Sequence, residues 1–331
     1  MYDALRRVLT PSGMSGILCA AWLTTAGTVG EAWAERIALL SSDAVPSYSQ
    51  AMEGIQATQS PSTTIVQYVV SEPMSDARRI GQRVRVSRPD LVIAIGLRAA
   101  VVAKLEIPDI PTVFCLVLFP EQSDLPASNM VGISMHPSVD YQLTSIRSMV
   151  PKARRIGILH SPGTREPFLT AARLWAQQHH LELVSATVSQ PQEVAHALKQ
   201  LQAIDTLWVL PDPAVVTNQS VEFLVSYSFE SHTPLFAFSP ALVQHGAIGA
   251  TYLDARDVGQ QAGRLAAQML RREAAPQLGT LVPAEQPRLA VNVRAAAHFG
   301  LMLSPSTLQA ASARFGTDHF AQGDAFLNIV P

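Results

Sequence analysis

The sequence predicts an α/β protein made of two Rossmann-like lobes with parallel sheets. Short apolar runs rich in β-branched residues alternate with amphipathic segments, which is typical of βαβ units in a parallel sheet. The alternation occurs as two successive series, separated at 119–140 by a stretch with three prolines and no helical period. A chain of 331 residues with 48% hydrophobic and 15% charged residues is long enough for two cores.

The first series supplies four strands, at RIALLSS, TTIVQYVV, DLVIAIG and IPTVFCLVL. Helices are expected between them near 46–57, 75–87 and 97–105 because apolar positions there recur at helical spacing. These elements are expected to complete one open sheet by about residue 118. One short extended piece follows at 130–135, where the chain is expected to cross to the second lobe.

The second series supplies strands at RRIGILHSP, LELVSATV, DTLWVLPD and TPLFAFS, with a helix opened by Pro191 between the second and third. The extended run GAIGATYLD, the strong helix at 255–273 and the short strand RLAVNV then finish both sheets. The expected amino-terminal lobe is 35–134 plus about 254–276. The carboxy-terminal lobe is 136–250 plus about 285–314, several crossings form a hinge, and 315–331 is a loosely held tail.

The first 34 residues predict a secretory signal peptide that is cleaved after Ala34, which implies a periplasmic protein. Arg6 and Arg7 form a basic start, 13–27 is an apolar run, and Ala32-Trp33-Ala34 is a small-x-small cleavage site. A membrane anchor is the alternative, although the apolar run is shorter than the roughly 20 residues that a span needs. Lipidation of Cys19 stays open, but the preceding GIL lacks the usual small residue.

Charge argues against a nucleic-acid-binding protein, and cysteine content argues against an internal disulfide. The formal net charge of −2, with acids and bases interspersed, argues against nucleic-acid binding. Cleavage of the leader would leave Cys115 alone, in an apolar strand, so we expect a buried small hydrophobe and no internal disulfide.

Enzymatic motifs are missing from the sequence. The Gly96 loop has one glycine and not the three of a dinucleotide fingerprint, and no Walker-type run occurs. There is no HExxH, no paired CxxC and no GxSxG. The sequence therefore predicts a binding protein that is not an enzyme and carries no cofactor or metal.

The predicted binding site lies at the carboxyl ends of the strands, where open parallel sheets bind ligands. Backbone amides near Gly96 and Ser134, together with Arg98, are expected to hold an anionic group of a small molecule, and Asp212 a donor. Arg98 is equally compatible with a surface position, Asp212 and Asp254 with helix caps, and each aromatic residue with the core. The candidate residues are Ser41, Ser42, Tyr48, Gly96, Leu97, Arg98, Phe119, Ser134, His160, Asp212, Phe238, Tyr252 and Asp254.

The order of several segments resembles a known family, the TrpX-like (tryptophan/tyrosine-binding) ABC transporter substrate-binding proteins. The similar segments are DLVIAIGLRAAVVA, NMVGISMHPSVDYQLTSIRSMVPKARRIGILHSPG, LPDPAVV, GAIGATYLDARDVGQQAGRLAAQML and LAVNVRAAAHFGLMLSPSTL. The resemblance covers 36 to about 314 and implies a type I periplasmic-binding fold with multiple hinge crossings. The sequence departs from the family pattern at Leu97-Arg98, at 118–120 and at 41–43, so an aromatic amino acid is not a safe ligand assignment.

The resemblance implies a monomeric periplasmic protein that captures a small organic ligand, amino acid-like or otherwise anionic or aromatic. Hinge closure would hold the ligand for delivery to an inner-membrane ABC permease. Two alternatives stay open at this stage. One is a sensory or accessory protein that signals to a membrane partner without transport. The other is an enzyme whose reacting groups come together only in the fold.

Overall fold

The computed structural model describes residues 35–42, 45–71, 76–162 and 166–316. The predicted signal peptide with Cys19, and residues 317–331 of the predicted tail, lie outside this range. Within it, no helix is both long enough and apolar enough to cross a membrane.

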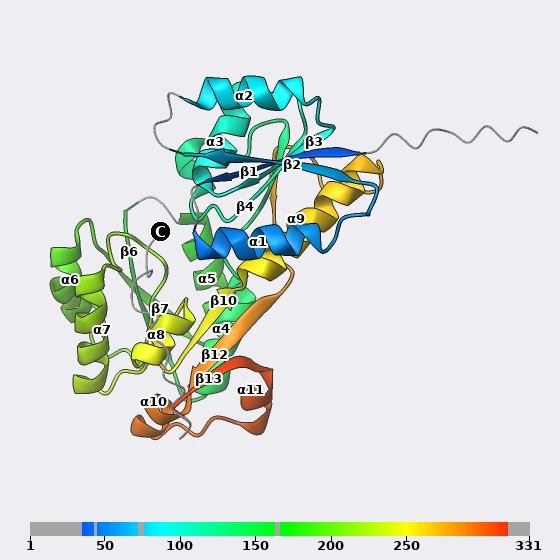
Figure 1. The fold of residues 1–331 in the computed structure, drawn as a ribbon. Coiled ribbons are helices and arrows are strands. Elements are labelled where there is room, and N and C mark those ends of the chain that lie inside the picture. Colours follow the sequence, from blue (N-terminus) through cyan, green and yellow to red (C-terminus); the bar gives the residue numbers. More distant parts are fainter. Residues whose placement is uncertain (1–34, 43–44, 72–75, 163–165, 317–331) are drawn as a thin grey trace, which may run out of the picture. The chain divides into compact units, whose positions relative to one another are not determined.

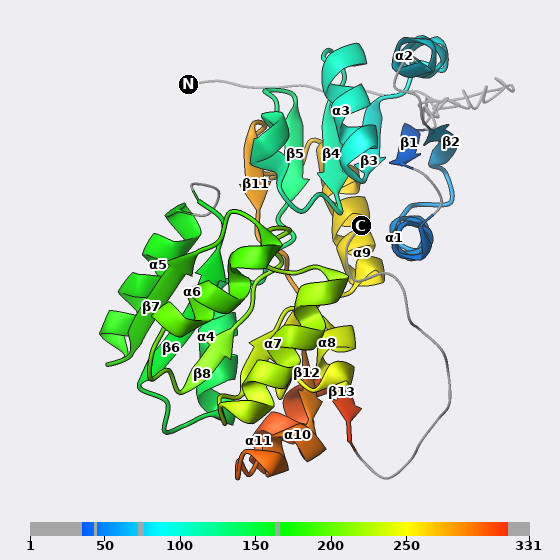
Figure 2. The same cartoon turned by 90° about the vertical axis from the view of Figure 1, so that its left-hand side faces the viewer.

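The first sheet has six strands in the order β11-β5-β4-β3-β1-β2, and all its pairs are parallel. Figure 1 labels β1 to β4, and Figure 2 also labels β5 and β11. The strands are β1 (Arg36–Ser42), β2 (Thr64–Val70), β3 (Leu91–Ile95), β4 (Thr112–Cys115), β5 (Met130–Ile133) and β11 (Thr280–Val282). Each residue of β3 is buried, as expected for a central strand covered on both faces.

Four helices cover the two faces of this sheet (Figure 2). Helices α2 (Ala77–Val86) and α3 (Leu97–Glu106) pack on one face. The strand residues Ala38, Val92 and Phe114 belong to the core between these helices and the sheet. Helices α1 (Pro46–Gln56) and α9 (Ala255–Leu270) pack on the other face and lie side by side. The predicted helix at 255–273 therefore covers the first sheet, although the chain has already built most of the second one.

The second sheet has seven strands in the order β13-β12-β10-β9-β8-β6-β7. They are β6 (Arg155–His160), β7 (Glu182–Thr187), β8 (Thr206–Trp208), β9 (Leu235–Ala237), β10 (Gly249–Leu253), β12 (Pro287–Asn292) and β13 (Ala311–Phe315). β10 and β12 pair antiparallel, which amends the expectation of purely parallel sheets. The reason is the route of the chain, because β12 enters the sheet from the end at which β10 left it.

Helices also cover both faces of the second sheet. One face carries α6 (Val194–Gln200), which follows the 3₁₀ turn η3 (Pro191–Glu193), with α7 (Asn218–Glu230) and α8 (Pro240–His245). The other face carries α4 (Val139–Met149), α5 (Glu166–Gln178) and α10 (Val293–His298), while α11 (Pro305–Ala310) leads into β13. On this second face Trp208 and Phe236 form the centre of the core.

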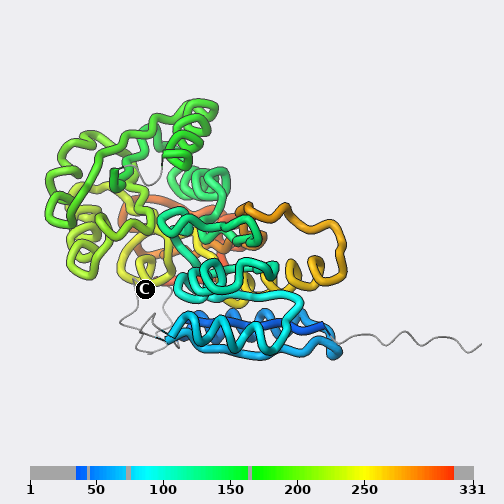
Figure 3. The backbone as a smooth tube through the Cα atoms, turned by 90° about the horizontal axis from the view of Figure 1, so that it is seen from above, coloured from blue at the N-terminus to red at the C-terminus, as the bar shows by residue number. Residues whose placement is uncertain are grey.

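The first sheet is not complete by residue 118, because β5 and β11 extend it. β11 lies between the predicted helix at 255–273 and the predicted strand RLAVNV, and it pairs with β5, Leu281 opposite Gly132. Three residues are too few to show a period, so the sequence does not reveal this strand. Figure 3 shows α9 and the orange segment after it beside the elements of the first sheet. The chain thus passes between the sheets at 134–138, at Asp254 and at 283–286.

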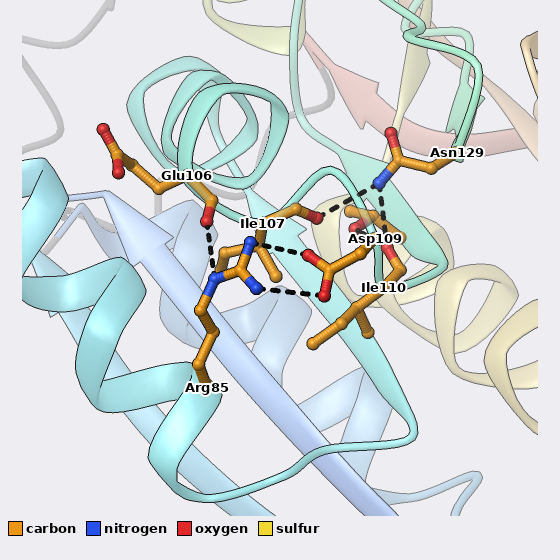
Figure 4. Close-up of polar contacts among 7 residues, drawn as sticks. Arg85, Glu106, Ile107, Asp109, Ile110 and Asn129 are labelled. Atoms are coloured by element: carbon orange, nitrogen blue, oxygen red, sulfur yellow. Dashed lines mark hydrogen bonds and ion pairs between the residues drawn. The ribbon is translucent and has the colours of Figure 1, made fainter.

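A polar cluster fixes the amino edge of the first sheet (Figure 4). Arg85 Nε donates to Glu106 O at 3.1 Å, and its Nη1 donates to Asp109 Oδ2 at 3.0 Å. Asn129 Nδ2 donates to Ile110 O at 2.8 Å. These contacts hold the turn between α3 and β4 at the edge opposite the carboxyl ends of the strands.

Candidate functional site

A cavity of about 230 Å³ lies at the carboxyl ends of strands from both sheets. The first sheet contributes the residues that follow β4 and β5, and the second contributes α4, α5 and the ends of β8, β9 and β10. The lining residues are Leu118, Phe119, Met135, His136, Pro137, Gln142, Phe168, Leu210, Pro211, Asp212, Pro213, Val216, Phe238, Ser239, Pro240, Thr251, Tyr252 and Leu253.

The walls of the cavity are mainly apolar and aromatic. The Phe168 ring lies 5.6 Å from the Trp208 ring, and the Phe119 ring lies 6.0 Å from the His136 ring. His136 Nε2 lies 3.0 Å from Leu118 O and donates to it, since a carbonyl oxygen can only accept. This bond ties the loop after β5 to the loop after β4. The cavity therefore presents flat, rigid surfaces of the kind that hold an apolar ligand body.

Asp212 is 2% exposed and organises the loop after β8. Its Oδ2 accepts from Ser161 N and from Ser161 Oγ, both at 2.8 Å, and its Oδ1 accepts from Ala214 N at 3.0 Å. A carboxylate has about four lone-pair sites, so these donors use most of its capacity. Asp212 lines the cavity, but its first role is to connect the ends of β6 and β8.

Two buried polar atoms of the second sheet lack a hydrogen-bond partner among the described residues: Thr251 Oγ1 and Trp208 Nε1. Trp208 pairs with Phe236, which pairs with Gly249, so Thr251 lies on the same face two residues further along β10. Thr251 lines the cavity and is 1% exposed. Trp208 lies level with Gly249, further from the carboxyl ends of the strands than Thr251, and contacts Phe168. An unpaired buried polar group costs about 1–3 kcal/mol, so the unpaired Thr251 hydroxyl is notable in a cavity wall.

Tyr252 connects the cavity to an ion-pair cluster at one crossing between the sheets. It lies opposite Arg288 in the β10–β12 pair. Arg288 contacts Asp257 (Nε to Oδ2, 2.7 Å) and Asp254 (Nη1 to Oδ2, 3.3 Å), both at the start of α9. Burial raises the pKa of Tyr252, while Arg288 opposes the rise. Burial and then the neighbouring Tyr252 also raise the pKa of Tyr141.

Asp254 is a helix cap, the alternative left open from the sequence. Its Oδ1 accepts from Arg256 N at 3.0 Å and from Asp257 N at 3.3 Å, which caps α9. Asp254 does not line the cavity.

On the first sheet, the predicted residues form a tight cluster. Gly96 has φ of 85°, and a Cβ there would lie 2.6 Å from Tyr48 Oη and 2.9 Å from Ser42 Oγ. Ser42 Oγ accepts from Ala99 N at 3.2 Å, so it caps α3. Glycine is therefore required at position 96 both by conformation and by space.

The amides of Gly96 and Ser134 themselves donate within the protein. Gly96 N donates to Cys115 O at 2.9 Å, and Ser134 N donates to Val282 O at 2.8 Å. These two amides are engaged within the protein, because β4 supplies an acceptor for the first and β11 for the second. Leu97 is 43% exposed at the first turn of α3. Cys115 itself is a buried free thiol, as predicted, and burial raises its pKa to about 12.

Four of the predicted site residues line the cavity: Phe119, Asp212, Phe238 and Tyr252. The cavity lining does not include the other nine, which are Ser41, Ser42, Tyr48, Gly96, Leu97, Arg98, Ser134, His160 and Asp254. His160 is 6% exposed, with Nδ1 3.0 Å from Ser161 O. The candidate residues from the sequence did not include Thr251, Gln142 or Phe168. Thr251 lies in the predicted extended run GAIGATYLD, so period-2 alternation along β10 could have placed it on the ligand side.

Comparison with known proteins decides the family. A family model described as ABC transporter substrate binding protein matches residues 41–314, which is most of the chain. The chain belongs to this family. Substrate-binding proteins of ABC transporters bind small molecules and act outside the cytoplasmic membrane together with membrane permeases. The two lobes, each with a helix-covered sheet, form the type I periplasmic-binding fold.

Two kinds of relative support this assignment of family and fold. A tyrosine-binding protein of Clostridioides difficile is 27% identical over 206 residues, which span 60% of this chain and 59% of the relative. A ligand-free, open substrate-binding protein with adhesive properties from Clostridium difficile aligns with a TM-score of 0.70 at 20% identity, over 86% of this chain and 100% of that one. An ABC domain in complex with L-Trp from Streptococcus pneumonia aligns with a TM-score of 0.59 at 20% identity, over 85% and 99%.

Proposed function

We propose that this substrate-binding protein serves an ABC importer from the periplasm. It captures a small organic ligand in the cavity between its lobes and delivers it to an inner-membrane permease. In this proposal residues 1–34 direct secretion and are removed after Ala34, and the remaining chain acts as a monomer.

The observation that carries the proposal is the origin of the cavity walls. Residues after β4 and β5 of one sheet, and after β8, β9 and β10 of the other, line the same space. A ligand that contacts both sets favours the state in which they are close together, which is hinge closure by population shift. The crossings at 134–138, Asp254 and 283–286 supply the hinge.

The proposed ligand contacts are the four predicted residues of the lining. Phe119 and Phe238 pack against the ligand body, Tyr252 contacts its edge, and Asp212 lies near a donor group. The tyrosine-binding relative and the L-Trp complex support an aromatic ligand body. The apolar and aromatic walls of the cavity support it independently.

A ligand screen by thermal unfolding tests this function. Amino acids, organic acids and aromatic metabolites are each added in excess to the purified protein. A specific ligand present at 100 times its Kd stabilises the fold by about 2.7 kcal/mol, which raises the melting temperature. Phe119→Ala is expected to weaken binding of any hit about tenfold by removing an aromatic wall.

The matched control is Phe223→Ala. Phe223 is 42% exposed on α7 and does not line the cavity, so its removal should leave the affinity unchanged. The proposal is wrong if no compound stabilises the protein, or if both phenylalanine variants bind the hits as the parent does.

A further inference from the structure

We propose that the cavity takes an uncharged aromatic compound of about one ring with one hydrogen-bonding group, and that it excludes carboxylates and amino acids. This inference rests on the proposed function, since it names the class of ligand for the same cavity. Three features carry it: the charge of the lining, the occupied amides of the first sheet, and the unpaired hydroxyl of Thr251.

Among the described residues, the lining offers a carboxylate no lysine or arginine, and its one histidine, His136, is hydrogen-bonded through Nε2 to Leu118 O. The acidic residue of the lining is Asp212. A ligand carboxylate would lose its hydration in a largely apolar space that already holds one carboxylate. Both effects disfavour an anion, since burial and a like charge each penalise the ionised form.

The first sheet does not supply the missing anion donors at the expected places. The amides of Gly96 and Ser134 donate to backbone carbonyls, and the amide of Ala99 donates to Ser42 Oγ. An anion at the start of α3 would also meet Leu97, a large aliphatic side chain that is 43% exposed. The amides of Gly96, Ser134 and Ala99 are therefore not available to an α-carboxylate.

An ammonium group is also poorly served. It brings three N–H donors, whereas Asp212 already accepts from Ser161 N, Ser161 Oγ and Ala214 N. About one lone-pair site of its carboxylate is left. A primary ammonium would keep unpaired donors in an apolar wall, which is costly.

Thr251 provides the specific contact. Thr251 is a lining residue of the cavity, and its buried hydroxyl has no partner among the described residues. A carbonyl or hydroxyl group on the ligand would satisfy it without bringing a charge. A cavity of 150 Å³ accommodates benzene. The 230 Å³ here fits one ring with a short polar substituent.

The test compares four compounds that share one ring and differ in the polar group: benzamide, benzoate, benzylamine and L-phenylalanine. Calorimetric titration of the purified protein is expected to give benzamide an affinity about tenfold or more above each of the other three. Thr251→Val, which keeps the shape and removes the hydroxyl, should weaken benzamide about tenfold. Thr251→Ser, which keeps the hydroxyl, should bind it within about threefold of the parent.

The inference is overturned if benzoate or L-phenylalanine binds as tightly as benzamide, if benzamide does not bind, or if Thr251→Val binds it like the parent. These results can be distinguished from a failure of the proposed receptor function. A carboxylate that binds in the cavity, with the loss at Phe119→Ala, would leave the receptor function intact and end only the assignment of ligand class. Absence of any ligand in the broad screen would end both.

Discussion

The two sheets differ in whether the polar groups near their carboxyl ends have hydrogen-bond partners. On the first sheet, the Gly96 and Ser134 amides and the Ser42 hydroxyl all form hydrogen bonds within the protein. On the second sheet, the Thr251 hydroxyl is buried in the cavity wall and unpaired among the described residues. Under the proposed function, the difference means that a strand end offers a polar contact to a ligand where the chain has not already used its donors and acceptors.

The largest expected effect concerns the close packing on the first sheet. Gly96→Ala places a methyl group 2.6 Å from Tyr48 Oη at a φ of 85°. The conformation, with ψ of 166°, is one that almost only glycine adopts and costs about 1–3 kcal/mol, and the overpacking costs about 1–3 kcal/mol. Urea unfolding should therefore show a loss of about 2–6 kcal/mol in the free energy of unfolding.

Gly300→Ala is the control for conformation alone. Gly300 has φ of 67°, and a Cβ there would meet nothing within 4 Å. Its loss should be about 1–2 kcal/mol. Equal losses for the two variants would mean that the Gly96 cluster has room for a side chain. This would contradict the tight packing of Gly96 against Tyr48 and Ser42.

A smaller effect is expected at Ser42, which sharpens the comparison by separating stability from binding. Ser42→Ala removes the oxygen that accepts from Ala99 N at 3.2 Å and should cost about 1 kcal/mol of unfolding free energy. Ser138→Ala, which removes the cap of α4 at the same 3.2 Å from Tyr141 N, should cost a similar amount.

Neither cap lines the cavity, so neither variant should change the affinity for a ligand of the screen. A drop in affinity for Ser42→Ala but not for Ser138→Ala would make Ser42 a ligand contact. The first sheet would then hold the ligand as the sequence had predicted.

The sequence predicted the long elements well because their patterns are strong. The strands at 36–42 and 91–95 and the helix at 255–270 follow from apolar runs and from a wide apolar stripe. Two features could not be predicted from the sequence, for physical reasons. β11 has only the residues Thr280–Val282, and the antiparallel direction of β12 depends on where the chain crosses.

The candidate site was predictable only as a region. Phe119, Asp212, Phe238 and Tyr252 were found because parallel strands end at one edge of a sheet. Which of the other strand-end groups stay available depends on hydrogen bonds that join distant segments, such as Ser134 N to Val282 O. No local pattern contains that information.

Thermodynamic stability of two threonine variants tests the central contrast most directly. Thr206 and Thr251 are both buried in the second sheet, but Thr206 Oγ1 donates to Pro234 O at 2.8 Å and Thr251 Oγ1 has no partner among the described residues. Thr206→Val should lower the free energy of unfolding by about 1 kcal/mol, because it removes this buried hydrogen bond, although Pro234 O still accepts from Leu207 N. Thr251→Val should raise it by about 1 kcal/mol in the ligand-free protein, because it removes an unpaired polar group. A loss at Thr251→Val as large as that at Thr206→Val would show that the protein itself satisfies this hydroxyl, and the cavity would have no polar group waiting for a ligand.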